Sequence, residues 1–475
     1  MPSAPPNLHP RCGSLGPTTS TLREKTMTAP EQPMTMEEAI KAQLALAIEP
    51  QEFDSPEYIK DPFPLYKRLR DHHPAYQDLF HNNWVITRYD DIVSVFQNND
   101  DFDRAEYDPR GDYEFGKKHV FGPNILEYGN SDEHRFLRNV VADQFVGNRL
   151  QTFLPFIEQI AREMMGRIWA KSADDVTRGF AETGEVELVS QFTTQFPIRV
   201  ISNMLGLPRE DEDTFVRWYQ HLIEGLGFGG EHLARGLQAR NEMWDYLDPL
   251  IRRAEDAPGE DLVSRIVHAE FRGQRMNADE IKGFIALLLA AGGDTTDKAI
   301  ALMWYHMLYT RPDQFEEVKQ SPELWTNVFT EMMRYDPVVH FQYRYTTREI
   351  KLHGEVIPER ASITLLLGAG NRDERVFKDP DTFDIFRDDL HMGRELRSGR
   401  YPDGKHGHLG FGMGQHFCMG YAMARQEAVI ASTRLLEAMK NPRPKFPTHP
   451  GITSPNLGSG GFRSPVELWI QFDPE

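Results

Sequence analysis

One stretch of this chain places a single cysteine where it could bind a metal. Cys418 lies within residues 411–420, FGMGQHFCMG, directly before a helical pattern that begins at about Gly420. Gly412 and Gly414 allow a tight turn and a close approach of the backbone to a flat ligand. The positive end of the following helix points at the sulfur and favours the thiolate, the form that binds metal. The alternative for an isolated cysteine is a small, buried, apolar packing role.

The order of residues in this segment, Phe-Gly-x-Gly-x-His-x-Cys-x-Gly, resembles the haem-binding loop of the cytochrome P450 superfamily, the haem-thiolate monooxygenases. The resemblance implies that Cys418 is the axial ligand of the iron of haem b (iron protoporphyrin IX). It also implies cofactor contacts from Phe411, Gly412, His416 and Gly420. In such proteins the thiolate donates electron density to the iron and favours cleavage of the O–O bond.

A long helix is predicted over residues 278–310, and its middle carries an acid and an alcohol after two glycines. Each glycine weakens a helix by about 1 kcal/mol relative to alanine. That cost is tolerated where a ligand approaches the backbone or where the helix opens locally. The resemblance implies that Ala291 and Gly292 leave room beside the haem, and that Asp294 and Thr295 deliver the protons that dioxygen reduction consumes. The alternative is a kinked core helix in which Asp294 and Thr295 make local hydrogen bonds.

Glu331 and Arg334 are three residues apart on another predicted helix, a spacing that usually forms a solvated surface pair. Here Pro337 ends the helix, and Arg387 follows before the cysteine segment. The resemblance implies that the three residues form the family's buried Glu–Arg–Arg network, which has a structural role. Loss of the carboxylate would then leave two guanidinium groups without a counter-ion.

The resemblance also implies cationic partners for the two haem propionates. His134 and Arg138 are four residues apart, which puts both on one helix face. Arg344 lies on a predicted strand after the Glu–Arg helix, and His408 and His416 flank the start of the cysteine loop. Arginine and histidine bind carboxylates through strong charge-assisted hydrogen bonds. Each residue alone is equally compatible with an exposed surface cation, and their order along the chain favours the propionate interpretation.

The chain departs from the family pattern between Arg387 and His408, where the connection is longer than usual. Residues 388–407 include the basic residues Arg394, Arg397, Arg400, Lys405 and His406. This segment should emerge on the cysteine side of the haem. One interpretation is a basic platform for an acidic ferredoxin. The other is a solvated surface loop, and the sequence supports both equally.

The substrate pocket is expected, by analogy with the family, to contain mostly apolar side chains. The expected lining residues are Leu287, Leu288, Val339, His340 and Phe341. His340 and Gln342 are the expected polar groups of the pocket. A terpene, a fatty acid, an aromatic ether and a macrolide are all compatible with this lining, because fold and chemistry do not fix the substrate.

The composition describes a globular protein of 475 residues, with 40% apolar and 11% aromatic residues. The net charge of −19 argues against a general nucleic-acid binder, which needs a basic face. Cys12 and Cys418 lie in very different contexts, so no disulfide framework is expected and a reducing cytoplasm is the predicted location. No apolar run reaches the length of a membrane span, and the N-terminus has no signal-peptide pattern, so no membrane association is expected.

Helical patterns fill the middle of the chain and short strands fall towards its two ends. Residues 1–35 are rich in Pro, Ser and Thr and are predicted to be a disordered extension, with residues 36–475 as a single domain. The elements used below include predicted helices at Pro56–His73, Gln191–Leu205, Ala278–Thr310 and Tyr421–Met439, and a predicted strand at Val466–Phe472. These patterns predict a mainly α fold with a small β subdomain, which is the arrangement of the cytochrome P450 fold.

The leading hypothesis is a haem-thiolate monooxygenase that inserts one oxygen atom from O2 into an apolar small organic molecule, by hydroxylation or oxidative dealkylation. Too few residues follow Cys418 for a fused flavin or iron–sulfur domain. Electrons are therefore expected from a separate ferredoxin and an NAD(P)H-dependent ferredoxin reductase. One alternative is a peroxygenase driven by H2O2, against which the Asp294–Thr295 pair argues. The other is a non-catalytic haem sensor, which would need neither residue.

Overall fold

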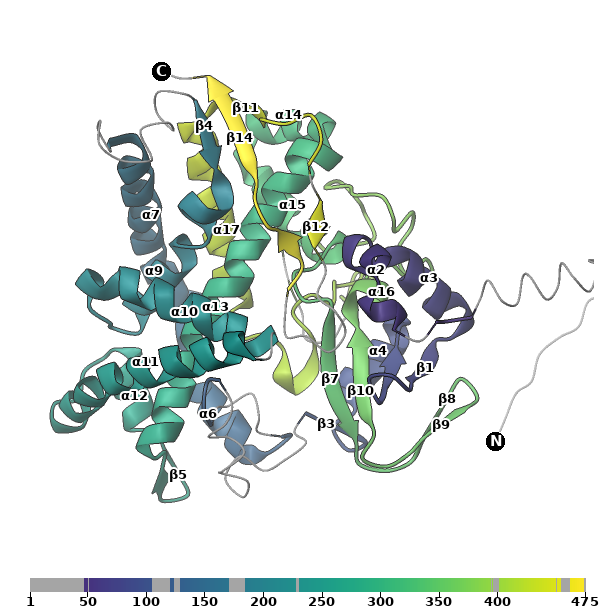
Figure 1. Cartoon of the computed structure of the whole chain (residues 1–475), viewed down its shortest axis with the longest axis horizontal. Helices are drawn as coiled ribbons and strands as arrows, with labels where there is room; N and C mark the ends of the chain where they lie inside the picture. The colour runs from purple at the N-terminus through teal and green to yellow at the C-terminus, as the bar shows by residue number, and fades with distance from the viewer. Residues whose placement is uncertain are drawn as a thin grey trace, which may run out of the picture. The chain divides into compact units, whose positions relative to one another are not determined.

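Helices form most of the part of the chain that the structure describes (Figure 1). The computed structural model describes residues 47–49, 51–104, 120–123, 129–170, 184–227, 230–393, 395, 401–449, 451–453 and 462–473. The chain divides into two units, Met1–Ala47 and Ile48–Glu475, and every element named below belongs to the second. The expected N-terminal extension, residues 1–35, lies outside the described residues.

The described helices and strands agree with a mainly α fold that carries small sheets. The α-helices are α2 Pro56–Lys60, α3 Phe63–His72, α4 Tyr89–Gln97, α6 Asp132–Ala142, α7 Gly147–Ala170, α9 Phe196–Met204, α10 Glu212–Gly227, α11 Glu231–Asp256, α12 Leu262–Val267, α13 Ala278–Tyr305, α14 Pro312–Gln320, α15 Trp325–Tyr335, α16 Leu367–Gly370 and α17 Tyr421–Ala438. The strands are β1 Ala75–Asp78, β2 Asn83–Ile86, β3 Phe102–Asp103, β4 Glu185–Glu187, β5 Glu270–Phe271, β6 Gln274–Arg275, β7 Phe341–Thr346, β8 Ile350–Leu352, β9 Glu355–Ile357, β10 Ser362–Leu366, β11 Lys440–Pro444, β12 Ile452–Thr453, β13 Ser464–Pro465 and β14 Trp469–Asp473.

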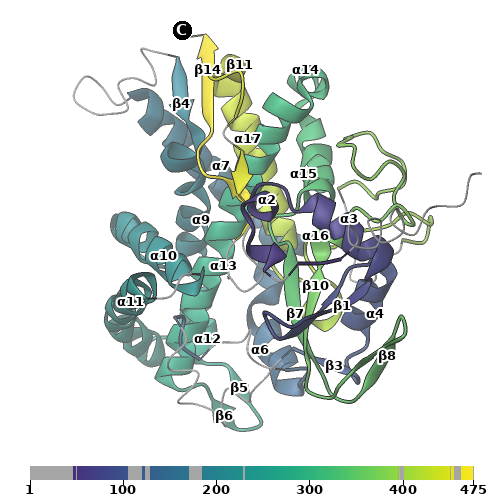
Figure 2. The same ribbon diagram turned by 45° about the vertical axis from the view of Figure 1, so that its right-hand side comes forward.

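The long helix α13 runs through the middle of the helical part, where it packs against α9, α10, α11, α15 and α17 (Figures 1 and 2). A capping box starts it, because the Asn277 side chain accepts from the Glu280 N–H and the Glu280 carboxylate accepts from the Asn277 N–H. The helix continues without a break through Gly292 and Gly293. Its flanks are therefore buried along most of its length, which explains the apolar run in its sequence.

A five-stranded sheet with the order β1-β2-β10-β7-β3 forms the largest β element among the described residues. β2 and β10 are parallel, and the other neighbouring strands are antiparallel. Figures 1 and 2 show β7 and β10 side by side, with α3, α4 and α16 close to them. In this register Arg344 of β7 lies opposite Ile363 of β10. The Arg344 guanidinium carbon lies 4.9 Å from the centre of the Phe96 ring of α4.

Several predicted elements have different boundaries in the structure. The range Pro56–His73 is two helices, α2 and α3, because Asp61 leaves the helical conformation and Pro62 cannot continue the hydrogen-bond ladder. The range Gln191–Leu205 is a π-helical turn, Val189–Thr193, followed by α9, whose first turn accommodates Pro197. The last predicted strand begins at Trp469 rather than Val466. The fold class itself is confirmed.

In the described ranges, no helix combines enough length with enough hydrophobicity to cross a lipid bilayer.

Candidate functional site

Two glycines shape the loop that carries Cys418. Gly412 and Gly414 have φ values of 65° and 69°, a conformation that favours glycine. A Cβ at Gly414 would lie 2.2 Å from the Phe96 carbonyl oxygen, so no side chain fits there. The Cys418 N–H donates to the Phe411 carbonyl oxygen at 3.0 Å, which closes the loop. The α17 helix begins at Tyr421, so its first turn lies directly after the cysteine.

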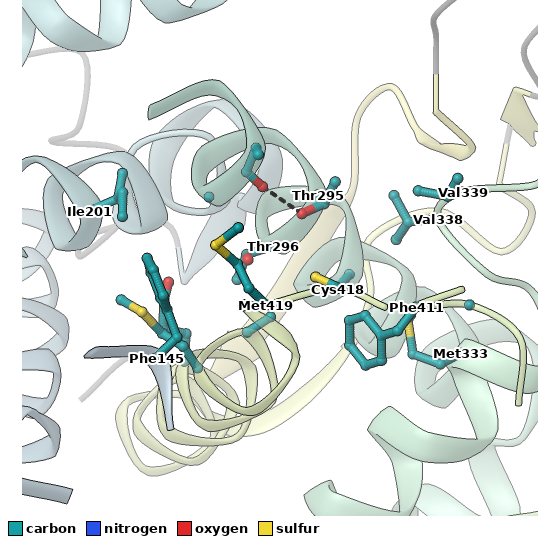
Figure 3. Close-up of a pocket in the computed structure, with 18 of the residues that line it drawn as sticks. Phe145, Ile201, Thr295, Thr296, Met333, Val338, Val339, Phe411, Cys418 and Met419 are labelled. Atoms are coloured by element: carbon teal, nitrogen blue, oxygen red, sulfur yellow. Dashed lines mark hydrogen bonds between the residues drawn. The ribbon is translucent and has the colours of Figure 1, made fainter. Parts of the chain in front are cut away.

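The thiol of Cys418 faces a cavity, but burial dominates its titration (Figure 3). Burial raises the pKa of the Cys418 thiol. The backbone N–H groups of Gly420 and Tyr421 and the charge of Arg138 lower that pKa, and they do not outweigh burial. The sequence predicted that the turn and the helix would favour the thiolate, and these groups act in that direction only as smaller contributions. A bound metal ion deprotonates a coordinating thiol outright.

The cavity has a volume of about 190 Å³ and lies between α13, α15, α17 and the cysteine loop. Helix α13 contributes Leu288, Ala291, Gly292, Thr295, Thr296 and Ala299 to its wall. The cysteine loop contributes Gly410, Phe411, Cys418, Met419 and Gly420, and α17 contributes Met423, Ala424 and Glu427. Figure 3 shows Thr295 of α13 and Cys418 together, with Val338 and Val339 to one side and Phe145 and Ile201 to the other. Most of these side chains are apolar.

The acid and the alcohol of α13 face different surroundings. The Thr295 hydroxyl lines the cavity and donates to the Ala291 carbonyl oxygen at 2.9 Å (Figure 3). Asp294 is buried and does not line the cavity. Its Oδ1 accepts from the Tyr219 hydroxyl at 2.8 Å and from the Lys298 ammonium. The carboxylate must therefore turn before it can exchange a proton with the cavity.

The two small residues that precede this pair also line the cavity. Ala291 is exposed to the empty space, and Gly292 lies beside it on α13. A Cβ at Gly292 would lie 3.1 Å from Ile201 Cγ1. The missing side chain of Gly292 therefore makes room for α9, while Ala291 leaves the space open on the cavity side.

Two histidines and two arginines gather at the cysteine loop. The rings of His134 and His416 are stacked with centroids 4.1 Å apart, and burial lowers the pKa of His134 to about 4 and of His416 to about 2. The charges of Arg344 and Arg138 act on His416 as well. Arg138 also donates to the Phe417 carbonyl oxygen. These four side chains come from α6, β7 and the loop itself, so the fold brings together residues far apart in the sequence.

Arg344 is buried and has no ion-pair partner among the described residues. Burial lowers the pKa of its guanidinium to about 9, and Nη1 donates to the Tyr343 carbonyl oxygen at 2.7 Å. Within the described residues, no carboxylate lies at ion-pair distance from it. A buried cation is costly unless an anionic group pairs with it. The side chains at this edge of the loop therefore suit a ligand that carries negative charge.

Glu331, Arg334 and Arg387 form a buried ionic network beneath the loop. Arg334 donates two hydrogen bonds to Glu331, from Nε to Oε2 at 2.8 Å and from Nη2 to Oε1 at 2.7 Å. Arg387 Nη1 approaches the same carboxylate at 3.3 Å. The Asp384 N–H adds a bond of 2.8 Å, and Arg334 also donates to the carbonyl oxygen of Pro380 at 2.8 Å. The network ties α15 to the segment that leads into the cysteine loop.

Comparison with known proteins decides the family. The cytochrome P450 family model matches residues 66–442. The chain belongs to the cytochrome P450 family. It is therefore a monooxygenase-type enzyme of a family that carries haem, acts on organic substrates and receives electrons from redox partners.

Bacterial proteins are among the relatives of this cytochrome P450. Cytochrome P450 107B1 from Saccharopolyspora erythraea is 32% identical over 373 residues, which cover 74% of this chain and 81% of the relative. The 6-deoxyerythronolide B hydroxylase of the same organism is 28% identical, covering 80% and 89%. The crystal structure of P450BioI in complex with hexadec-9Z-enoic acid ligated acyl carrier protein has a TM-score of 0.73 at 25% identity, covering 88% and 99%. Ligand-free TbtJ1 has a TM-score of 0.72 at 26% identity, covering 88% and 100%.

The residues of this cytochrome P450 fit a haem. Cys418 offers a sulfur to the cavity, glycines keep the loop backbone close, and Arg344 is a buried cation that lacks an anion among the described residues. His408 is buried near the start of the cysteine loop. Its Nδ1 accepts from the Gly410 N–H at 3.2 Å, and burial lowers its pKa to about 3, with smaller contributions from Arg425 and Arg334. Its Nε2 has no hydrogen-bond partner in the described part of the chain, and its propionate role stays a prediction.

The structure divides the predicted pocket residues into two groups. Leu288 and Val339 line the cavity, whereas Leu287, His340 and Phe341 do not. Leu287 is buried in the main core, and Phe341 packs in a smaller core with residues of α3. His340 is buried too, with Nδ1 3.0 Å from the Tyr66 hydroxyl and Nε2 3.5 Å from Asp336 Oδ1. His340 is therefore a structural residue, held away from the cavity by its contacts with Tyr66 and Asp336.

Sequence reasoning missed several lining residues. Phe145 and Ile201 reach the cavity, and neither adjoins a predicted lining residue. Glu427 of α17 also lines it, with burial raising the pKa of its carboxyl group well above the usual range. Its Oε2 has no hydrogen-bond partner within the described ranges. No local pattern marks these residues, because packing of distant helices brings them to the cavity.

The basic segment 388–407 is described only in part. Arg394, Arg397 and Arg400 lie outside the described residues. His406 packs against the rings of Tyr89 and Phe377, with centroid distances of 5.8 and 6.0 Å. The His406 side chain is therefore partly buried against these two rings and is not an exposed basic group.

Proposed function

We propose that this cytochrome P450 binds haem b through Cys418 and inserts one oxygen atom from O2 into an apolar small organic molecule, by hydroxylation or oxidative dealkylation. A ferredoxin and an NAD(P)H-dependent ferredoxin reductase supply the electrons, and a reducing cytoplasm keeps the thiol free. The observation that carries the proposal is that the Cys418 thiol and the Thr295 hydroxyl line one largely apolar cavity.

The chain supplies the ligands and the charges for the cofactor. Cys418 Sγ would hold the iron, and Arg138, Arg344, His134 and His416 would hold the propionates with charge-assisted hydrogen bonds. When bound, the haem would supply the reductive activation of dioxygen. The buried guanidinium groups at the loop would then gain anionic partners.

Protons reach the cavity through α13. The Thr295 hydroxyl hydrogen now points at the Ala291 carbonyl oxygen, and rotation about the Cβ–Oγ1 bond turns it into the cavity. Asp294 restores that proton after it leaves Tyr219 and Lys298. General acids positioned in this way contribute about 10²–10⁴-fold to rate.

The cavity wall binds and orients an apolar substrate. Leu288, Val338, Val339 and Phe329 exclude water from the space in front of Thr295. Gln342 is the polar side chain that β7 adds to this wall. The name of the 6-deoxyerythronolide B hydroxylase, a relative over 80% of this chain, is consistent with hydroxylation as the reaction.

The test is turnover of a panel of apolar compounds, selected by the spin-state change they cause in the haem-loaded protein. Product should require NAD(P)H, O2, ferredoxin and reductase together. Thr295→Val should lower product per electron consumed about tenfold or more, since a general acid contributes at least about 10²-fold. The matched control is Thr433→Val, which removes the same type of bond on α17, from Thr433 to the Val429 carbonyl oxygen. Turnover with H2O2 alone at equal rate would instead identify a peroxygenase, and no turnover with either oxidant would favour a sensor.

A further inference from the structure

Near Asp294, the α13 helix carries a second buried acid, Asp297, and a lysine, Lys298, whose ammonium lies close to both carboxylates. The Lys298 ammonium contacts Asp294 Oδ1 and lies 3.8 Å from Asp297 Oδ2. Asp294 is 2% exposed and Asp297 is 4% exposed. One cation therefore serves two buried carboxylates.

The two carboxylates differ in their other partners. Asp297 Oδ1 accepts from the Thr193 hydroxyl at 2.5 Å, and its Oδ2 accepts from the Thr194 hydroxyl at 3.3 Å. Asp294 Oδ1 accepts from Tyr219, but its Oδ2 is buried with no hydrogen-bond partner in the described part of the chain. Asp297 is fixed through both oxygens, whereas half of Asp294 is unsatisfied. A buried acceptor without a donor is costly, so Asp294 gains a bond by turning and Asp297 does not.

Charge explains why Asp294 needs a second acid behind it. If Asp294 turned away from a lysine that had no other carboxylate, it would leave a buried ammonium uncompensated. Burial alone lowers the pKa of Lys298, but Asp294 and Asp297 together outweigh burial and raise it. Burial raises the pKa of Asp297 to about 6, against the lowering effect of Lys298. The lysine therefore stays charged, and Asp297 remains available as its counter-ion near neutral pH.

We infer that Asp297 is a positioning residue for proton delivery. It takes over the Lys298 ammonium when Asp294 turns towards Thr295, and it returns the ammonium when Asp294 comes back. The π-helical turn Val189–Thr193 and its following residue anchor Asp297, so the lysine moves between a fixed acid and a mobile one. This inference rests on the proposed function, because it needs Asp294 to be the proton donor.

Unfolding of the haem-loaded protein tests the sharing of Lys298 without any turnover. Lys298→Met should lower the unfolding temperature, because two buried carboxylates lose their cation. Adding Asp297→Asn to that variant should restore part of the loss, and Asp297→Asn alone should unfold no lower than the natural chain. Additive losses in the double variant would overturn the inference, because they would make Asp297 an independent structural residue.

NADPH consumption in H2O and D2O tests the positioning role, with a plant-type ferredoxin and its reductase as electron donors. In Asp297→Asn, Lys298 binds Asp294 alone, so consumption should fall about tenfold or more and the solvent isotope effect should rise, since a positioned acid is worth at least about 10²-fold. The matched variant Tyr219→Phe removes the other bond that holds Asp294, and it should not slow consumption. An unchanged isotope effect in Asp297→Asn would overturn the inference. An unchanged rate in Asp294→Asn would instead refute the proposed proton donor itself.

Discussion

The buried Glu331 network makes the sharpest stability prediction. Glu331 and Arg334 are fully buried, and Arg387 adds a second guanidinium at 3.3 Å. Glu331→Gln keeps the shape of the side chain but removes the negative charge between two arginines. Loss of one partner from a buried ion pair costs about 3–5 kcal/mol. In a chain of this size each kcal/mol lowers the unfolding midpoint by about 2 °C, so this loss should lower it by about 6–10 °C.

The matched control is an exposed pair with the same sequence spacing. Glu316 and Lys319 of α14 are also three residues apart and 2.8 Å from each other, but the Glu316 side chain is 65% exposed. Glu316→Gln should change stability by about 0.5 kcal/mol or less. Both variants are followed by thermal unfolding at several heating rates and by urea titration, together with the haem content of the purified protein. If Glu331→Gln unfolds at the same temperature as Glu316→Gln, the structural role of the network is refuted.

Three further predictions concern the cysteine loop, acid stability and the cavity wall. Gly414→Ala forces a Cβ to within 2.2 Å of the Phe96 carbonyl oxygen, so it should abolish haem incorporation. The control is Gly404→Ala, because Gly404 has a similar φ of 81° and an added Cβ there would meet no atom within 4 Å. This control should lower the free energy of unfolding by only about 1 kcal/mol. Equal haem content in the two variants would contradict the reasoning. Burial lowers the pKa of His340 to about 4, so the free energy of unfolding should fall by up to about 1.4 kcal/mol per pH unit as the pH drops from about 6.5 to 4. His340→Gln should reduce this pH dependence, measured by urea titration at each pH. Ala291→Leu should fill the space in front of Thr295 and weaken the spin-state response to the compound panel. Ala299→Leu, at the far end of the wall, should weaken that response less. The reverse order would contradict the proposed position of the substrate in front of Thr295.

Sequence reasoning located the cysteine loop and the ionic network because each depends on a local pattern. Two glycines with positive φ define the loop, and the spacing of Glu331 and Arg334 fixes their bidentate contact within one helix. The burial of that pair and its join to Arg387 needed the resemblance to the family, because the spacing alone is typical of a solvated surface pair. Helix α13 was also predictable, because its apolar run and its Asn277 cap lie in one continuous segment.

The remaining parts of the site depend on contacts between distant elements. Thr295 and Asp294 are adjacent in the sequence, yet one faces the cavity and the other faces Tyr219 of α10. Neighbouring positions on a helix point about 100° apart, and only the packing of α10 shows which one meets the cavity. His340 and Phe341 also lie away from the cavity because of contacts with distant residues: Phe341 packs in a core with residues of α3, and His340 contacts the Tyr66 hydroxyl. Glu427 and Phe145 gave no signal at all, since neither belongs to a motif.

The most direct test of the account is the absorption spectrum of the reduced, carbon monoxide-bound protein. The natural chain should show the band of a thiolate-ligated haem, because Cys418 is the cysteine that lines the cavity. Cys418→His should replace that band with the one of an imidazole-ligated haem. A natural chain that shows the imidazole-type band, or that stays colourless after reconstitution with haem, would contradict the central claim that Cys418 holds the iron.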